Sequence, residues 1–351
     1  MASKILDLHA SDPPLVIAVG AGGVGKTTLA AAMGLESARA GRDTLVMTFD
    51  PSLRLKDALG VEEGSEEEEV EVLGAPGGGR LFASLLDARR TFDRLVERYA
   101  PSEEVRRRIL GNSYYGHLAG HLGGILEYMA VERLYEVAQE GRYDRVILDT
   151  PPTSQAIEFL EAPRRVVDFL ESGALKIALR PWFDDGGKLK VASRFRLVGR
   201  GIESFLDRAV GLDLLRDMSE FFRAFEPLFE GFRDRALEVE KLLASSDTLF
   251  ALVTGPGEGR VADTLFFARR LREAGYSLGP VVVNRVHPTF EAPPASRKGE
   301  LAAGAELFHW LGERHQKGLA ELRRRLPEDR LLAMPLEADE PTDLKALGAL
   351  G

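Results

Sequence analysis

The stretch Leu15–Thr28, LVIAVGAGGVGKTT, decides the fold. Five apolar residues run directly into Gly20, four residues separate Gly20 from Gly25, and Lys26 and Thr27 follow. This order of residue types predicts a strand, a glycine-rich loop that curls around a phosphate group, and a helix that begins at the end of the loop. An incidental glycine-rich turn is the alternative, and the good helix formers after Thr28 argue against it.

The chemistry of the loop suits a nucleoside triphosphate. Glycines let successive N–H groups point at an anion, and the N-terminus of the following helix adds its positive end. In such a P-loop, Lys26 neutralises the β- and γ-phosphates and Thr27 gives its hydroxyl to Mg²⁺. The expected nucleotide-binding residues of the loop are Gly20, Ala21, Gly22, Gly23, Val24, Gly25, Lys26, Thr27 and Thr28.

Apolar runs typical of buried parallel strands recur along the chain, and helical patterns separate nearly all of them. This alternation predicts an α/β fold, a doubly wound and mostly parallel sheet with ligands at the carboxyl ends of its strands. The runs are Leu15 to Val19, Thr44 to Phe49, Leu81 to Leu85, Val146 to Leu148, Leu249 to Val253, Val281 to Val283 and Leu331 to Met334.

Two intervals, 87–139 and 158–243, are too long and too helical for simple crossovers, so we expect them to form an inserted helical subdomain. No Gly/Ser linker lies between the two intervals, which favours a single P-loop domain over residues 1–351. The segment 61–72 carries seven glutamates and is expected to be a solvated loop or an edge segment.

An apolar stripe at helical spacing extends from Leu214 to Phe232, and Pro227 is expected to kink or interrupt it. The stripe has two interpretations: ordinary core, or a groove for a hydrophobic helical client. Only Met129 and Met218 fall within the helical intervals, so the adaptable methionine lining of promiscuous grooves is missing.

Two acids follow apolar runs and are expected at the same edge of the sheet as the P-loop. Asp149 ends the run Val146–Leu148 and is the candidate for ordering Mg²⁺, through water. Asp50 ends the run Thr44–Phe49 and is the candidate catalytic residue that orients the attacking water. The alternative for each acid is a cap on the next helix.

With these motifs in place, the chain resembles the ArsA-like ATPases, which include the arsenite-efflux ATPase and the targeting factor for tail-anchored membrane proteins. The resemblance spans almost the whole chain. It implies that Asp50 lies in switch I, that Asp149 opens switch II, and that Asn284 and the loop at Pro335 hold adenine. The motifs that carry it are GAGGVGKTT from Gly20, DPS from Asp50, DTPPT from Asp149, VT from Val253, VN from Val283 and PL from Pro335.

The chain departs from that family at Ala21, where the family usually carries a lysine that reaches the partner's phosphates across a dimer. The departure leaves three readings: slow hydrolysis, a basic substitute such as Arg285 or the segment 188–200, or a different subunit that supplies the lysine. No Cys-x-x-Cys follows Asn284, which excludes the zinc that clasps some dimers of the family. Arsenite binding through thiolates is likewise excluded, because the chain contains no cysteine.

Composition limits the partners and the location. The formal net charge of −9 offers no general attraction to nucleic acid, so no nucleic-acid partner is expected. No apolar run approaches the roughly 20 residues that span a bilayer, and the N-terminus lacks a signal-peptide pattern. We therefore expect a cytoplasmic protein without an integral membrane segment.

Together these features predict an ATPase that uses ATP and Mg²⁺, with Lys26 and Asp50 as its catalytic residues and a homodimer or heterodimer as its working form. Nucleotide-driven closure of the dimer would alter the surface offered to a helical client or partner. The alternative is a regulatory or scaffold subunit with little turnover. A ParA- or MinD-like positioning ATPase is disfavoured, because the segment 343–351 is a poor membrane anchor.

Overall fold

The computed structural model divides the chain into two compact units. The sheet unit contains Met1–Leu86, Leu134–Ile157 and Lys241–Gly351, and the helical unit contains Asp87–Arg133 and Glu158–Glu240. The residues that the structure describes are 13–48, 69–74, 78–112, 115, 125–150, 153–172, 220–292, 300–327, 330–337 and 344–347.

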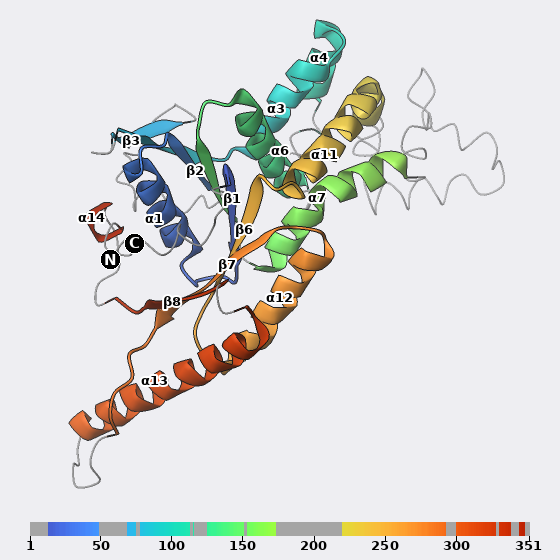
Figure 1. The fold of residues 1–351 in the computed structure, drawn as a ribbon. Coiled ribbons are helices and arrows are strands. Elements are labelled where there is room, and N and C mark those ends of the chain that lie inside the picture. The colour runs from blue at the N-terminus through green and yellow to red at the C-terminus, as the bar shows by residue number, and fades with distance from the viewer. Residues whose placement is uncertain are drawn as a thin grey trace, which may run out of the picture. The chain divides into compact units, whose positions relative to one another are not determined.

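The sheet unit is organised around an eight-stranded sheet in the order β3-β4-β2-β5-β1-β6-β7-β8 (Figure 1). Every pairing is parallel except that of β3 with β4. The predicted mostly parallel α/β sheet is therefore confirmed. The strands are β1 Leu15–Gly20, β2 Thr44–Thr48, β3 Val70–Gly74, β4 Arg80–Leu85, β5 Arg145–Asp149, β6 Thr248–Thr254, β7 Leu278–Val286 and β8 Leu331–Pro335.

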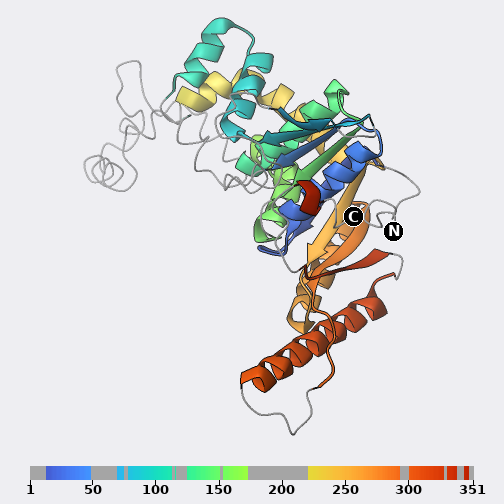
Figure 2. The same cartoon turned by 90° about the vertical axis from the view of Figure 1, so that its left-hand side faces the viewer.

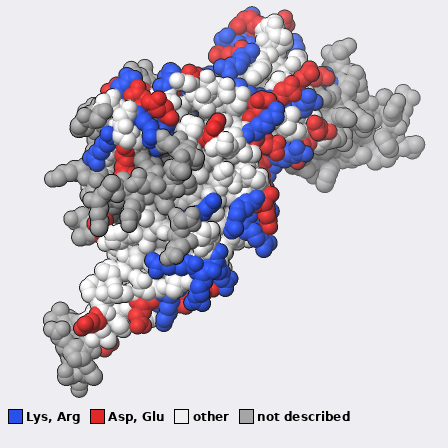
Figure 3. Space-filling view, viewed as in Figure 1, with Lys and Arg blue, Asp and Glu red and all other residues white. Residues whose placement is uncertain are grey.

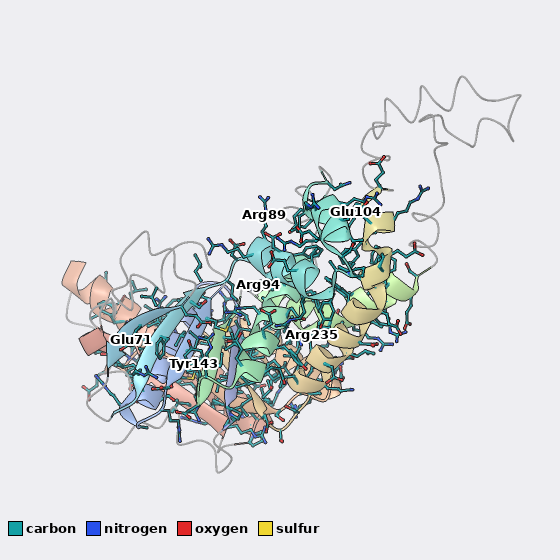
Figure 4. The ribbon with its side chains drawn as sticks, turned by 90° about the horizontal axis from the view of Figure 1, so that it is seen from above. Glu71, Arg89, Arg94, Glu104, Tyr143 and Arg235 are labelled. Atoms are coloured by element: carbon teal, nitrogen blue, oxygen red, sulfur yellow. The ribbon has the colours of Figure 1, made fainter. Side chains whose placement is uncertain are left out.

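The antiparallel strand β3 was not among the predicted strands, because it directly follows a glutamate-rich stretch that reads as a solvated loop or an edge segment. The glutamate-rich segment ends in this strand, so the edge interpretation holds for its last residues. Glu69 accepts a hydrogen bond from the Tyr143 hydroxyl at 2.7 Å, and Arg142 forms an ion pair with it at 2.7 Å. Backbone pairing holds β3 beside β4, and the Tyr143 ring meets the ring of Phe82, a residue of β4, edge-on. Figure 4 labels Tyr143 together with Glu71 of β3.

Helices cover both faces of this sheet. The helix α1 (Lys26–Arg39) follows β1, and its alanines are buried against strands, which allows a close approach. The helix α1 connects β1 to β2, which lies toward the β3 edge of the sheet. The helices α12 (Val261–Glu273) and α13 (Glu300–Arg325) connect β6 to β7 and β7 to β8, toward the opposite edge. Right-handed crossovers therefore place α1 on one face and α12 and α13 on the other (Figure 2). The short α14 (Leu344–Leu347) packs against α1.

The helical unit contains α3 (Ala88–Tyr99), α4 (Glu103–Leu110) and the first part of α6 (Ile125–Glu140). After β5 it continues with most of α7 (Thr153–Glu171) and of α11 (Phe229–Leu243). The expected intervals 87–139 and 158–243 end a few residues later than the two segments of this unit, because α6 and α11 each continue into the sheet unit. Side-chain caps begin two of its helices: Asp87 accepts from the Arg90 N–H at 3.0 Å, and Ser102 accepts from the Val105 N–H at 3.3 Å.

The described part of the apolar stripe forms the core of the helical unit. The groove interpretation is wrong for these residues, because their aromatic rings pack on one another; Phe225 and Phe232, for example, have ring centroids 4.7 Å apart. Leu214, Leu215 and Met218 lie outside the described residues. Those of the stripe that are buried are Phe221, Phe222, Phe225, Leu228 and Phe232.

Pro227 interrupts the helix at the predicted place. A 3₁₀ turn, Glu226–Leu228, separates helical residues 220–225 from α11, since proline has no N–H for an α-helical hydrogen bond. Along the chain as far as the structure describes it, no helix has the length and apolar character needed to cross a membrane.

Candidate nucleotide site

Backbone geometry favours glycine at three positions of the loop between β1 and α1. The φ angles of Gly20, Gly23 and Gly25 are 152°, 74° and 92°, all in the region that side chains disfavour. A Cβ at Gly20 would lie 2.0 Å from the Val253 carbonyl oxygen, and one at Gly25 would lie 2.4 Å from the Asn284 Nδ2 atom. The glycines therefore let the loop curl while it touches the neighbouring strands.

Lys26 lies at the first position of α1 and is 93% buried, with a relative exposure of 7%. Its Nζ atom donates a hydrogen bond to the Ala21 carbonyl oxygen at 3.0 Å, so the ammonium group lies across the loop. This places a positive charge at the N-terminus of a helix, where an anion is already favoured.

Asp149 ends β5 directly between β1 and β2, where its register partners are Ala18 and Thr48. Its Oδ2 atom accepts hydrogen bonds from the Thr27 hydroxyl at 2.6 Å and from the Thr48 hydroxyl at 2.9 Å. A buried carboxylate beside two hydroxyls is a set of hard oxygen donors, which is what Mg²⁺ prefers. The structure thus brings together the two residues predicted to hold the metal.

The segment after Asp149 is tied to β1. The Thr150 hydroxyl donates to the Ala18 carbonyl oxygen at 2.7 Å, and the Thr150 backbone N–H donates to the same oxygen at 3.3 Å. This contact fixes the chain at the point where it leaves β5 for the stretch that follows.

Asn284 and Arg285, near the end of β7, contact the P-loop backbone. The Asn284 Nδ2 atom donates to the Val24 carbonyl oxygen at 2.9 Å, and Arg285 Nη1 donates to the Gly23 carbonyl oxygen at 3.2 Å. The Arg285 backbone N–H donates to Asn284 Oδ1 at 2.9 Å. Pro335 ends the neighbouring strand β8, where it pairs with Val286.

Some predicted residues lie outside the described part of the chain, among them Asp50 and the basic segment 188–200. Sequence reasoning also missed Thr48, whose hydroxyl binds Asp149. The available signal was a polar residue one position before the end of the apolar run Thr44–Phe49. Arg285 was named only as a substitute charge, and its hydrogen bond to the loop carbonyl was not foreseen.

Charge on the described surface is mixed. Figure 3 shows Lys and Arg gathered over α12 and the neighbouring end of α13. Several of these arginines are in ion pairs, such as Arg269 with Glu273 at 3.0 Å and Arg325 with Glu321 at 2.6 Å. Neighbouring carboxylates therefore offset part of this local positive charge.

A glycine-rich loop with Lys-Thr at the carboxyl edge of a parallel sheet, with an acid at the end of an adjacent strand, defines the class of P-loop nucleotide-binding proteins. Comparison with known families then narrows the class. The model of the family described as anion-transporting ATPase (ArsA_ATPase) matches residues 14–298. The chain belongs to this ArsA-like ATPase family, as its motifs predicted.

Similar proteins occur in bacteria and fungi. The putative arsenical pump-driving ATPase 1 of Aquifex aeolicus is 25% identical over 280 residues, which cover 78% of this chain and 63% of that protein. Protein Rv2184c of Mycobacterium tuberculosis is 34% identical over 345 residues, which cover 95% of this chain and 73% of that protein. ATPase get3 of Schizosaccharomyces pombe is 28% identical over 144 residues, 41% of each chain.

The chain matches only part of several relatives. It covers 63% of the Aquifex protein and 26% of a putative arsenical pump-driving ATPase of Halobacterium salinarum. The shared family therefore indicates the fold and an ATPase-type nucleotide site.

Proposed function

We propose that this protein binds ATP with Mg²⁺ in the P-loop and hydrolyses it to ADP and phosphate. The observation that carries the proposal is the Asp149 carboxylate, which accepts from the hydroxyls of Thr27 and Thr48 at 2.6 and 2.9 Å. An ordinary strand-terminal aspartate caps the helix that follows it, whereas this one turns toward the first turn of α1.

Each residue of the site has a separate task. Lys26 replaces its hydrogen bond to the neutral Ala21 carbonyl oxygen by hydrogen bonds to phosphate oxygens. These are stronger, because both the donor and the acceptor are charged. Thr27 and Asp149 hold Mg²⁺, the latter through water, and the metal would supply charge neutralisation at the phosphates. Asp50 orients the attacking water. Asn284 and Pro335 hold the adenine, for which Asn284 has a second amide N–H besides the one that binds the Val24 carbonyl oxygen. Little covalent chemistry is asked of the protein, so positioning and charge carry the catalysis.

We further propose that nucleotide binding closes a dimer and that closure changes the surface offered to a helical client or partner. The division into a sheet unit and a helical unit supports this proposal, because a separate compact unit can move as a body when nucleotide binds to the other unit. The relatives include a putative arsenical pump-driving ATPase and a get3 ATPase. Arsenical binding by thiolates is not part of the proposal, because the chain has no cysteine.

A second candidate function is a regulatory subunit that binds nucleotide with negligible turnover. Ala21 favours it, because a methyl group cannot neutralise a phosphate of a partner. The two candidates share the nucleotide site and differ only in whether the chain completes a hydrolytic centre with its own second copy.

Steady-state phosphate release by the purified chain, with Lys26→Ala as the blank, tests the enzymatic proposal. We expect wild-type release to exceed the blank and to require Mg²⁺. Equal rates for the two proteins, together with ADP binding by the wild type, would favour the regulatory subunit. Ala21→Lys is the matched gain-of-function variant, and a large rise in its rate would assign slow turnover to this position.

Molar mass by light scattering, with and without Mg-ATP, tests dimer closure. A nucleotide-dependent dimer in the wild type that Lys26→Ala cannot form is the expected result. A strict monomer in both states would refute the dimer mechanism while leaving nucleotide binding intact.

A further inference from the structure

We propose that Arg285 is a positioning residue that, together with Asn284, fastens the outer side of the P-loop so that its N–H groups face the phosphates. The inference rests on the proposed nucleotide site. It assigns Arg285 to the geometry of the loop, and so differs from a role as a substitute positive charge for a partner's phosphate.

The first step is the pair of contacts. Arg285 Nη1 reaches the Gly23 carbonyl oxygen at 3.2 Å and Asn284 Nδ2 reaches the Val24 carbonyl oxygen at 2.9 Å, so two successive carbonyl groups of the loop are bound by two successive residues of β7. A trans peptide holds its C=O and the next N–H on opposite sides. With both carbonyls turned toward β7, the N–H groups of Val24 and Gly25 turn the other way, into the cradle.

The second step is the backbone at Arg285. Its φ angle is 60°, and it is the only described residue other than glycine with a positive φ. The pairing of β7 with β8 also shifts register between Val283 and Val286, across Asn284 and Arg285. Such register shifts change the direction of side chains near functional sites. An arginine with a left-handed backbone conformation is strained, and it persists only where the surrounding structure holds it. Here the local bulge directs two consecutive side chains at one loop.

The third step concerns how the pair is held together. Arg285 donates its backbone N–H to Asn284 Oδ1 at 2.9 Å, which leaves the Asn284 Nδ2 atom directed at the loop. A Cβ on Gly25 would lie 2.4 Å from that Nδ2 atom, so the fit between β7 and the loop is tight. The conformation of the loop and that of the bulge therefore depend on each other.

The test uses Arg285→Gly, which accepts the positive φ and removes the guanidinium, and Arg285→Lys, which keeps the charge but has no fork of N–H donors. Arg269→Ala is the matched control, since Arg269 is an exposed arginine of α12 paired with Glu273 at 3.0 Å. Calorimetry of the full chain measures Mg-ADP and, separately, inorganic tripolyphosphate, which has the phosphates but no base.

We expect Arg285→Gly to lower the affinity for both ligands by the same factor, about tenfold. The affinities of Arg285→Lys should lie between those of Arg285→Gly and the wild type. The ligand-free melting temperature of Arg285→Gly should stay the same or rise, because strain is relieved. Weaker ADP binding with unchanged tripolyphosphate binding would assign Arg285 to the base and overturn the inference. Unchanged binding of both ligands, or a clear drop in ligand-free melting temperature, would overturn it as well. A wild-type chain that binds neither ligand would instead refute the proposed function.

Discussion

Replacement of Gly20 by Ala tests whether the end of β1 must lack a side chain. Gly20 is the last residue of β1 and pairs with Val253 of β6. A Cβ there would lie 2.0 Å from the Val253 carbonyl oxygen and 2.9 Å from the carbonyl carbon. These atoms belong to a central strand, so they cannot rotate away as the end of a side chain would.

The cost has two parts. The φ angle of 152° lies in a region that is nearly reserved for glycine, and holding another residue there costs about 1–3 kcal/mol. Displacing the β6 backbone adds an overpacking cost of about 1–3 kcal/mol. We therefore expect Gly20→Ala to lower the free energy of unfolding of the sheet unit by about 2–6 kcal/mol.

Gly23→Ala is the matched control. Its φ angle of 74° is also positive, but a Cβ there meets no atom within 4 Å. Only the left-handed penalty of about 1–2 kcal/mol applies, partly offset by the smaller entropy of the unfolded chain. Comparing the two variants separates the clash from the strain.

Urea unfolding can be followed by the fluorescence of Trp310, which lies on α13 of the sheet unit. The chain has two tryptophans, so a Trp182→Phe background isolates this signal. Midpoints and slopes then give the loss of stability. If Gly20→Ala and Gly23→Ala differ by less than about 0.5 kcal/mol at equal slopes, the close approach of β1 and β6 does not limit this position.

Three further changes test other parts of the fold. Glu132→Ala removes the buried carboxylate that pairs with Arg235 at 2.6 Å, and should lower the free energy of unfolding of the helical unit by about 3–5 kcal/mol. Urea unfolding measures this loss, and a loss below about 1 kcal/mol would contradict the prediction. Gly34→Ala puts a Cβ 2.4 Å from Val46 Cγ2, so overpacking of about 1–3 kcal/mol should exceed the helix-propensity gain of about 1 kcal/mol; a higher melting temperature would contradict it. Burial is the main cause that lowers the pKa of His315 below 6.5, so the unfolded chain takes up a proton that the folded chain does not, and stability falls as the pH drops through 6.5. The melting temperature of His315→Gln should therefore fall less than that of the wild type between pH 7.5 and pH 5. An equal fall in the two proteins would contradict this prediction.

The parallel strands were predictable because buried strands are continuously apolar. Val146–Leu148, for example, is flanked by polar residues and needs no tertiary information to stand out. The edge strand β3 was not, because it pairs with one neighbour only, and the contacts of the preceding Glu69 join it to Arg142 and Tyr143, 73 and 74 residues further along the chain. Contacts of such long range leave no periodic signal in the sequence. For the apolar stripe from Leu214 to Phe232, the secondary structure was predictable and the packing was not. Its spacing gave the helix, but whether Phe225 faces a core or a groove depends on what packs against it.

The site shows the same division. The P-loop follows from local order, since Gly20, Gly25, Lys26 and Thr27 lie within eight positions. Asp149 followed from the rule that strand ends of a parallel sheet share an edge. Its hydrogen bond to Thr48, and that of Arg285 to Gly23, depend on strand register and on a shift within β7, which no spacing in the sequence reveals.

Ala21 contributes to the site through its backbone as well as through the side chain it lacks. Its carbonyl oxygen accepts from Lys26 Nζ at 3.0 Å, and any residue at this position would present the same oxygen. The methyl group packs against the apolar core around α1. Phosphate binding within one chain therefore does not require a lysine at position 21, whereas charge compensation between two chains would. A lysine at position 21 would therefore affect the proposed closed dimer and its turnover, and would not affect nucleotide binding by the single chain.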